Sequence, residues 1–74
     1  MALKDNFRAN LRKEMTQRGL SQSELSRRSG VRQATISEAL AGVREPSFET
    51  IEALARVLDV NAAQFFLEPP AKAS

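Results

Sequence analysis

Apolar residues recur every three or four positions along most of the chain, a spacing typical of amphipathic helices. In the first such segment, Lys4 to Arg18, the side chains of Phe7, Leu11 and Met15 fall four apart, and Gly19 follows as a C-terminal stop. No segment alternates apolar and polar residues with β-branched side chains, and no Asn-Gly or Asp-Gly turn occurs. The pattern therefore predicts helices and no sheet.

Two short helices are expected next. Ser21 and Glu24 have the spacing of a capping box, so the second helix should open at Ser21, bury Leu25 and stop at Gly30. The third should cover residues 33–41 and end before a glycine. Its inner face is marked by Ile36, Ala39 and Leu40.

The last two helices are read from their caps. Pro46 keeps Glu45 out of helical geometry, so a fourth helix should start at Ser47. Asn61 and Gln64 form a second box-like cap and predict a fifth helix of one or two turns. The fourth helix carries the clearest apolar stripe, Phe48, Ile51, Leu54, Ala55 and Leu58, and the fifth has Phe65, Phe66 and Leu67 to bury.

The expected fold is one compact, all-α, five-helix domain over residues 1–67, because 74 residues leave no room for two cores. Residues 68–74 have nothing to bury and are expected to form a flexible C-terminal tail. The chain contains no Cys and no His, so we expect no disulfide, no metal site and no cofactor. Stability must then come from helix packing, helped by self-association.

The net charge is only +2, but its distribution is uneven. Residues 1–32 carry eight basic and three acidic side chains, whereas residues 33–74 carry three basic and six acidic ones. This polarity could orient the domain on a polyanion, and an ordinary mixed-charge surface is the alternative. With no apolar run suited to a signal peptide or a membrane span, a cytoplasmic protein with no membrane partner is expected.

The segment from Gly19 to Gly42 carries the functional hypothesis. Its two short helices are joined across a turn at Gly30 and must lean on the same core, which leaves one face of the second helix projecting, as reading a major groove requires. On a helical wheel the outward residues are Ala34, Ser37, Glu38 and Ala41, with Gln33 and Thr35 on the flanks. Small residues allow close approach to base edges, and Gln and Glu can address adenine and cytosine. The alternative is an ordinary solvent-exposed helix face, which would carry the same types of residue.

A longer spaced set decides between these alternatives. It consists of Gly19-Leu20-Ser21-Gln22-Ser23-Glu24-Leu25-Ser26, then Gly30-Val31, Ile36, Gly42 and Pro46-Ser47, and continues from Ile51 to Val60. Together these residues closely resemble the lambda-repressor-like, XRE-type helix-turn-helix family. The resemblance implies the family's five-helix fold and a transcriptional regulator, expected to be a repressor, that binds a palindromic operator in double-stranded DNA as a homodimer.

The resemblance also implies which side chains contact DNA. Gln22 matches the glutamine that begins the family's second helix, where N–H groups meet a phosphate. Arg44 lies in the loop after the recognition helix, where the family often touches the backbone, and Arg32 could reach a phosphate or a guanine. The base contacts are expected from Gln33, Ala34, Ser37 and Glu38. The phosphate contacts are expected from Gln22, Arg32, Thr35 and Arg44.

Four positions depart from the family pattern or fit it awkwardly. Met15 and Leu40 stand where the family often pairs an Arg with a Glu, and we expect these two apolar side chains to touch. Arg32 stands where the family prefers a Ser or Thr cap. Glu38 faces phosphates and should be repelled unless it accepts from a cytosine amino group or pairs with an arginine such as Arg32, so it should impose selectivity more than affinity.

Two other classes of function were weighed. An enzyme is not expected, because the chain lacks His, Cys and Tyr and has no glycine-rich phosphate loop, which leaves no catalytic residue to name. The second alternative is an antitoxin-like or other partner-binding module of the same fold. Phe65 and Phe66 are the candidate residues for a dimer or partner interface. The alternative is that both rings close the core of this small domain.

Overall fold

The computed structural model describes the backbone of residues 3–67 and the side chains of residues 6–67. Within this part of the chain the elements are four α-helices and a final 3-10 helix: α1 Leu3–Arg18, α2 Gln22–Ser29, α3 Gln33–Ala41, α4 Phe48–Leu58 and η1 Ala62–Phe66. The predicted all-α architecture is confirmed, with the fifth helix a 3-10 turn instead of an α-helix. The tail expected at residues 68–74 lies outside the described residues.

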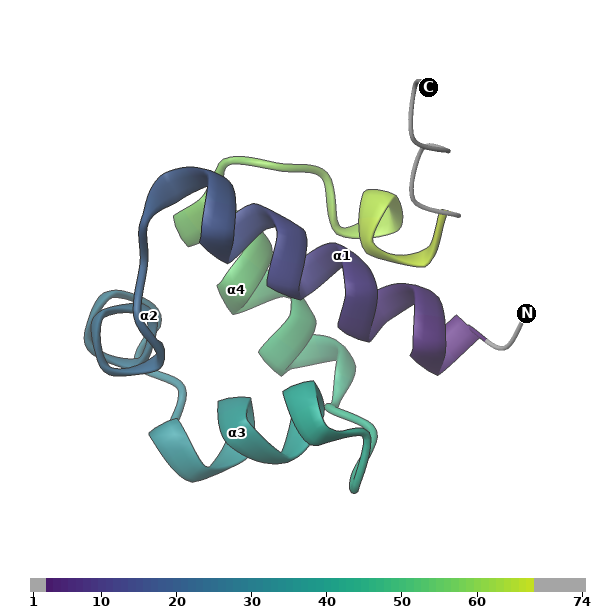
Figure 1. Ribbon diagram of the computed structural model, residues 1–74, viewed down its shortest axis with the longest axis horizontal. Coiled ribbons are helices and arrows are strands. Elements are labelled where there is room, and N and C mark those ends of the chain that lie inside the picture. Colours follow the sequence, from purple (N-terminus) through teal and green to yellow (C-terminus); the bar gives the residue numbers. More distant parts are fainter. Residues whose placement is uncertain (1–2, 68–74) are drawn as a thin grey trace.

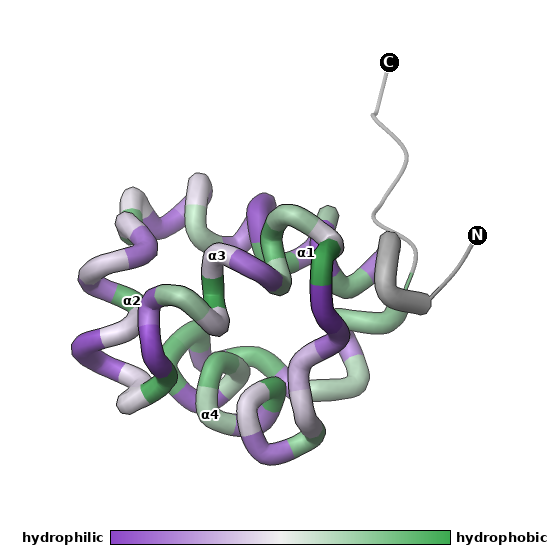
Figure 2. The backbone as a smooth tube through the Cα atoms, turned by 90° about the horizontal axis from the view of Figure 1, so that it is seen from below, coloured by the Kyte–Doolittle hydropathy of each residue, from purple (hydrophilic) through white to green (hydrophobic). Residues whose placement is uncertain are grey.

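The helices enclose a single core (Figure 1). Helix α1 crosses the molecule, α3 runs along the opposite side, α4 lies in the centre and η1 packs beside α1. Figure 2 looks from the side of α3 and shows how much of α2 is polar. The buried apolar side chains are Phe7, Leu11, Met15, Leu25, Ile36, Ala39, Leu40, Ile51, Leu54, Ala55, Leu58 and Phe65.

Two apolar residues that the pattern assigned to the core are exposed instead. Phe48, expected in the apolar stripe of α4, is 65% exposed, and Leu67 is 61% exposed. Phe48 is the first residue of α4, and because helical side chains lean toward the N-terminus its ring projects beyond the end of the core. Leu67 follows the last residue of η1, where the backbone turns to an extended conformation and carries the side chain outward.

The expected caps are present at three helix starts. Ser21 accepts a hydrogen bond from the Glu24 N–H at 3.1 Å, and the Glu24 carboxylate accepts from the Ser21 N–H at 3.4 Å. Asn61 and Gln64 form the same reciprocal pair at η1, and Ser47 accepts from the backbone of α4. Each cap satisfies N–H groups that a helix leaves without an internal partner, so these boundaries are set locally.

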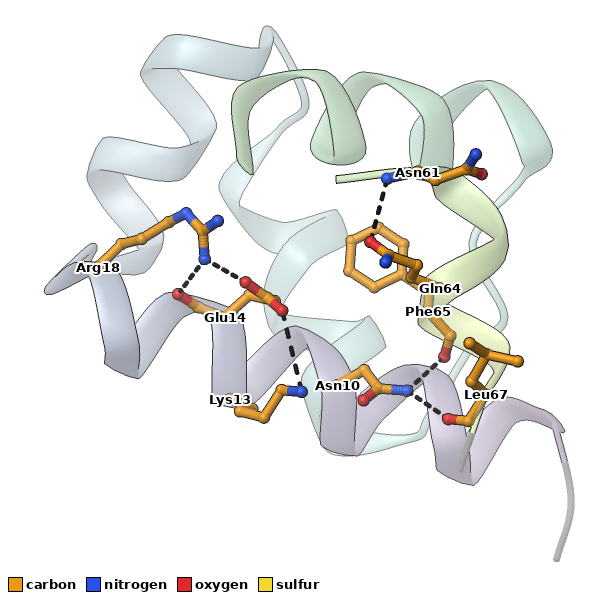
Figure 3. A network of polar contacts seen from close by, with 8 residues as sticks. All are labelled: Asn10, Lys13, Glu14, Arg18, Asn61, Gln64, Phe65 and Leu67. Atoms are coloured by element: carbon orange, nitrogen blue, oxygen red, sulfur yellow. Dashed lines mark hydrogen bonds and ion pairs between the residues drawn. The ribbon is translucent and has the colours of Figure 1, made fainter. Parts of the chain in front are cut away.

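Two amide side chains that the sequence pattern did not single out hold η1 against α1, and one of them, Asn10, is drawn in Figure 3. Asn10 donates to the Phe65 carbonyl at 2.9 Å and to the Leu67 carbonyl at 2.7 Å. Asn6, one turn earlier, donates to the Phe66 carbonyl at 3.2 Å. The signal that could have found them is their i, i+4 spacing beside the apolar face of α1, where an amide needs a buried partner.

Gly30 ends α2 in the left-handed conformation, with φ of 79°, and a Cβ placed there would meet no atom within 4 Å. A Gly30→Ala substitution is therefore expected to cost only backbone strain and to lower the free energy of unfolding by about 1 kcal/mol. Urea denaturation followed by circular dichroism would measure it. An unchanged or raised stability would show that the turn relaxes out of this conformation at no cost.

Candidate nucleic-acid interface

Helix α3 is fixed to the core by one face and presents the other to solvent. Ile36 is fully buried, and Ala39 and Leu40 retain 4% and 8% exposure. On the opposite face, the side chains of Gln33, Ala34, Ser37 and Ala41 are exposed, as the helical wheel predicts, whereas Thr35 and Glu38 are half-buried. The surface offered by α3 therefore has small and hydrogen-bonding groups at its centre and no large apolar residue.

The turn between α2 and α3 is held by side-chain hydroxyl groups. Ser26 donates to the Val31 carbonyl, and the Val31 N–H donates to Ser29 Oγ at 3.1 Å. The Ser26 hydroxyl therefore ties the end of the turn back to α2. Together with the left-handed Gly30, these bonds set the direction in which α3 leaves the turn.

Gln22 is the first residue of α2 and its side chain is half-buried. The Ser21 hydroxyl occupies the N–H of Glu24, whereas the earlier N–H groups of a helix have no partner within the helix. The start of α2 therefore offers backbone donors and the positive end of the helix dipole beside the Gln22 amide. This is an arrangement that can bind a phosphate.

Arg32 occupies the N-cap position of α3 and makes no side-chain capping bond, as its identity predicts. Its side chain is exposed, so the guanidinium group is available to a ligand beside the start of α3. Arg44 lies beyond the other end of α3 and is also exposed. The two arginines thus bracket the exposed face of α3 from its two ends.

The ion pair at Glu38 differs from the one expected. Glu38 Oε1 lies 3.6 Å from Arg44 Nε, and the expected Arg32 is not its partner among the ion pairs of the described residues. The reason is helical geometry: Arg32 lies six positions before Glu38, whereas the chain reverses at Gly42 and brings Arg44 back beside the last turn of α3. Both side chains remain partly exposed, so the pair adds little stability.

A family model described as helix-turn-helix, HTH_3, matches residues 11–65, which run from the second half of α1 through α2, α3 and α4 into η1. The chain belongs to this XRE-type, lambda-repressor-like helix-turn-helix family. It is a DNA-binding domain of a non-enzymatic family, as the sequence analysis expects.

A solved structure agrees with this assignment. The helix-turn-helix domain is similar to the crystal structure of a hypothetical transcription factor, NHTF, from Neisseria, with a TM-score of 0.85 and 30% sequence identity. The match covers 90% of this chain and 75% of the other. A search of curated proteins finds no match.

Two residues that no sequence pattern marked bond to the recognition helix of this helix-turn-helix domain. Arg8 and Arg12, both on α1, reach the carbonyl groups at the C-terminal end of α3. Met15, on the same face of α1, and Leu40 of α3 are both buried in the core. Their direct contact stays a prediction, and the observed polar link between these helices is supplied by the two arginines.

The proposed dimer residues differ in their surroundings. Phe65 is 1% exposed, with its ring centroid 5.2 Å from that of Phe7, so it closes the core of the helix-turn-helix domain. Phe66 is half-buried, and its ring stacks on that of Phe7 with the two centroids 6.1 Å apart. Leu67 lines an open groove of about 280 Å³ between α1 and η1, beside Asn10 and Lys13. An interface at this end would use Phe66 and Leu67 before Phe65.

Other binding chemistries find little support in the part of the chain that the structure describes. The side chains of residues 6–67 include no cluster of three His, Cys, Asp or Glu able to hold a metal ion. None of the described helices combines the length and the apolar character needed to cross a membrane.

Proposed function

We propose that the protein is a sequence-specific transcriptional regulator, acting as a repressor, whose helix α3 enters the major groove of a palindromic operator. The observation that carries the proposal is the two-faced character of α3: a buried Ile36 anchors one side, while Gln33, Ala34 and Ser37 stand exposed on the other. Side chains of this size let the helix approach base edges closely, and the glutamine amide can donate and accept at adenine.

The phosphate contacts in this proposal come from the residues around α3. Gln22 would bind one phosphate with the N–H groups at the start of α2, and Arg32 and Thr35 would bind the backbone beside the start of α3. Arg44 would bind the backbone beyond its other end. These contacts fix the register of the domain on the duplex and leave sequence reading to Gln33, Ala34, Ser37 and Glu38.

A homodimer is part of the proposal, because a single copy offers too short a reading surface. Helix α3 has nine residues and is about 13 Å long, so it reaches one half-site. Two half-sites in successive major grooves lie about 34 Å apart and require two copies related by a two-fold axis. The exposed Leu67 and half-buried Phe66 supply apolar surface for that contact. A DNA-binding regulator must share a compartment with its DNA, so the proposal includes the expected cytoplasmic location.

The experiment that tests the proposal is selection from a pool of randomised duplexes at near-physiological salt. We expect enrichment of a palindrome whose half-sites are about one helical turn apart. Enrichment of a single half-site would support sequence reading and contradict the dimer. Weak, steeply salt-dependent binding with no enriched sequence would contradict the proposal.

That last result would favour a second candidate, a partner-binding or antitoxin-like module of the same fold. The observation in its favour is the exposed apolar surface: Val43, Phe48 and Leu67 are 75%, 65% and 61% exposed. Val43 and Phe48 lie at the two ends of the loop between α3 and α4, whereas Leu67 follows η1, and an exposed apolar side chain can anchor a partner protein. Concentration-dependent mass in solution separates self-association from binding to a different protein.

Glu38→Ala should tighten binding to unrelated DNA and blur the base preference, because it removes a carboxylate that faces phosphates and frees Arg44 from its ion pair. The gain for non-specific duplexes is expected to be about two- to fivefold. Titration of selected and scrambled duplexes measures both affinities. Glu52→Ala, at an exposed position on α4, makes the same charge change away from α3 and serves as the control. Weaker binding to every duplex would contradict the assigned role of Glu38.

A further inference from the structure

The end of the recognition helix is closed by two kinds of hydrogen bond. The first kind comes from the backbone: the Gly42 N–H donates to the Ala39 carbonyl at 3.2 Å, and the Val43 N–H donates to the Glu38 carbonyl at 3.0 Å. A helix leaves its last four carbonyl groups without an internal partner. The backbone turn after α3 therefore supplies donors to two of these four carbonyl groups. The carbonyl groups of Leu40 and Ala41 receive none from it.

The second kind comes from α1. Arg12 Nη2 donates to the Leu40 carbonyl at 3.3 Å, and Arg8 Nη1 donates to the Ala41 carbonyl at 3.4 Å. Arg8 and Arg12 are one helical turn apart, so they lie on the same face of α1. Each of the last four carbonyl groups of α3 therefore accepts a hydrogen bond, and two of the four donors belong to a different helix.

The local sequence of α3 leaves both of its ends without a side chain that caps the helix or complements its dipole. Its N-cap residue, Arg32, makes no capping bond, and its last turn contains no basic residue. The negative end of the α3 dipole is instead met by two guanidinium groups from α1. Gly42 also leaves room for Arg8, because a Cβ there would lie 2.7 Å from Arg8 Nη1.

We propose that Arg8 and Arg12 are positioning residues that set the angle of α3 relative to α1, and through it the sequence selectivity of DNA binding, by bonding to the C-terminal carbonyl groups of α3. The selectivity part of this inference rests on the proposed function. Its structural basis is independent of DNA. With one end uncapped, a nine-residue helix depends on its packed face and on this clamp for its orientation.

The test compares Arg8→Gln, Arg12→Gln and the double variant with the parent chain, using the selected duplex and a scrambled one. Positioning predicts that the ratio of specific to non-specific affinity falls about tenfold in the double variant, while the dependence of affinity on salt is unchanged. The corresponding lysine variants keep a cationic donor and should recover most of the ratio. Arg18→Gln removes the same charge from α1 away from α3, where Arg18 pairs with Glu14, and should leave the ratio unchanged.

A different result would overturn the proposal. If the arginines contact phosphates directly, binding weakens equally for both duplexes and the slope of log affinity against log salt falls by about 0.9 for each lost contact. An unchanged ratio in the double variant would show that the two hydrogen bonds do not orient α3. If the double variant fails to fold, the ratio of specific to non-specific affinity is measured on the single variants instead.

Amide hydrogen exchange in the free protein tests the clamp without DNA. In the double variant the amides in the last turn of α3 should exchange roughly tenfold faster, with those of α4 unchanged. If the parent chain selects no duplex, the proposed function fails, but this measurement still decides whether the arginines anchor α3. Unchanged exchange in α3 would overturn the positioning role even if the DNA experiments succeed.

Discussion

Phe65→Ala is expected to lower the free energy of unfolding by about 3–5 kcal/mol and, with it, to abolish DNA binding at physiological temperature. The ring is 1% exposed and packs edge-on against Phe7, so its removal leaves a cavity between α1 and η1. A domain of this size has a total stability of roughly 5–10 kcal/mol. The substitution therefore removes a large part of the free energy of unfolding. Thermal or urea denaturation followed by circular dichroism measures this loss.

Phe66→Ala is the matched control, because it removes the same ring from the next, half-buried position. We expect a smaller loss of about 1–2 kcal/mol, since less apolar area leaves the core. If this turn forms the dimer contact, Phe66→Ala should weaken self-association in sedimentation experiments more than it weakens the fold. A Phe65→Ala variant that keeps its stability but dissociates a dimer would show that Phe65 serves the interface instead of the core.

Gln33→Ala is expected to lower affinity for the selected duplex by about 1–3 kcal/mol and to relax the preference at one base pair of each half-site. The side chain is exposed at the first position of α3 and lies outside the core, so the free energy of unfolding should change by less than about 0.5 kcal/mol. Titration against single-base variants of the selected site measures the loss position by position.

Gln17→Ala, at an exposed position on α1, is the control for a lost amide. It should leave the base preference intact, and a backbone contact from Gln17 would weaken binding equally for all duplexes. If Gln33→Ala weakened every duplex equally and left the base preference unchanged, Gln33 would be a phosphate contact and base reading would pass to the other exposed residues of α3.

Much of the architecture could be predicted because its determinants are close in sequence. The Ser21 and Glu24 box begins α2, Gly30 ends it in a left-handed turn, and Ser47 begins α4. The buried face of α3 follows from helical spacing alone, since Ile36, three residues before Ala39, must share its side. Such features involve residues within one or two turns, so sequence spacing alone identifies the partners in their hydrogen bonds.

At the candidate site, too, the features set by neighbouring residues could be predicted, whereas a contact that depends on the path of the chain could not. The exposure of Gln33 and Ser37 follows from the helical wheel, and the absence of a capping bond at Arg32 follows from its side chain. The partner of Glu38 does not follow in this way. Arg44 rather than Arg32 meets it because of the path of the chain after Gly42, which no local spacing encodes.

The sequence by itself determined the helices, their caps, the turn and the family of this protein, because short-range hydrogen bonds and the period of apolar residues specify them. Only the tertiary structure decided the rest. Phe48 is exposed because, as the first residue of α4, it projects its ring beyond the end of the core, and Asn10 bonds to carbonyl groups 55 and 57 positions away. Arg12 likewise meets α3 across 28 positions. These contacts depend on how distant helices cross, and that geometry is fixed by packing of the whole core rather than by any one segment.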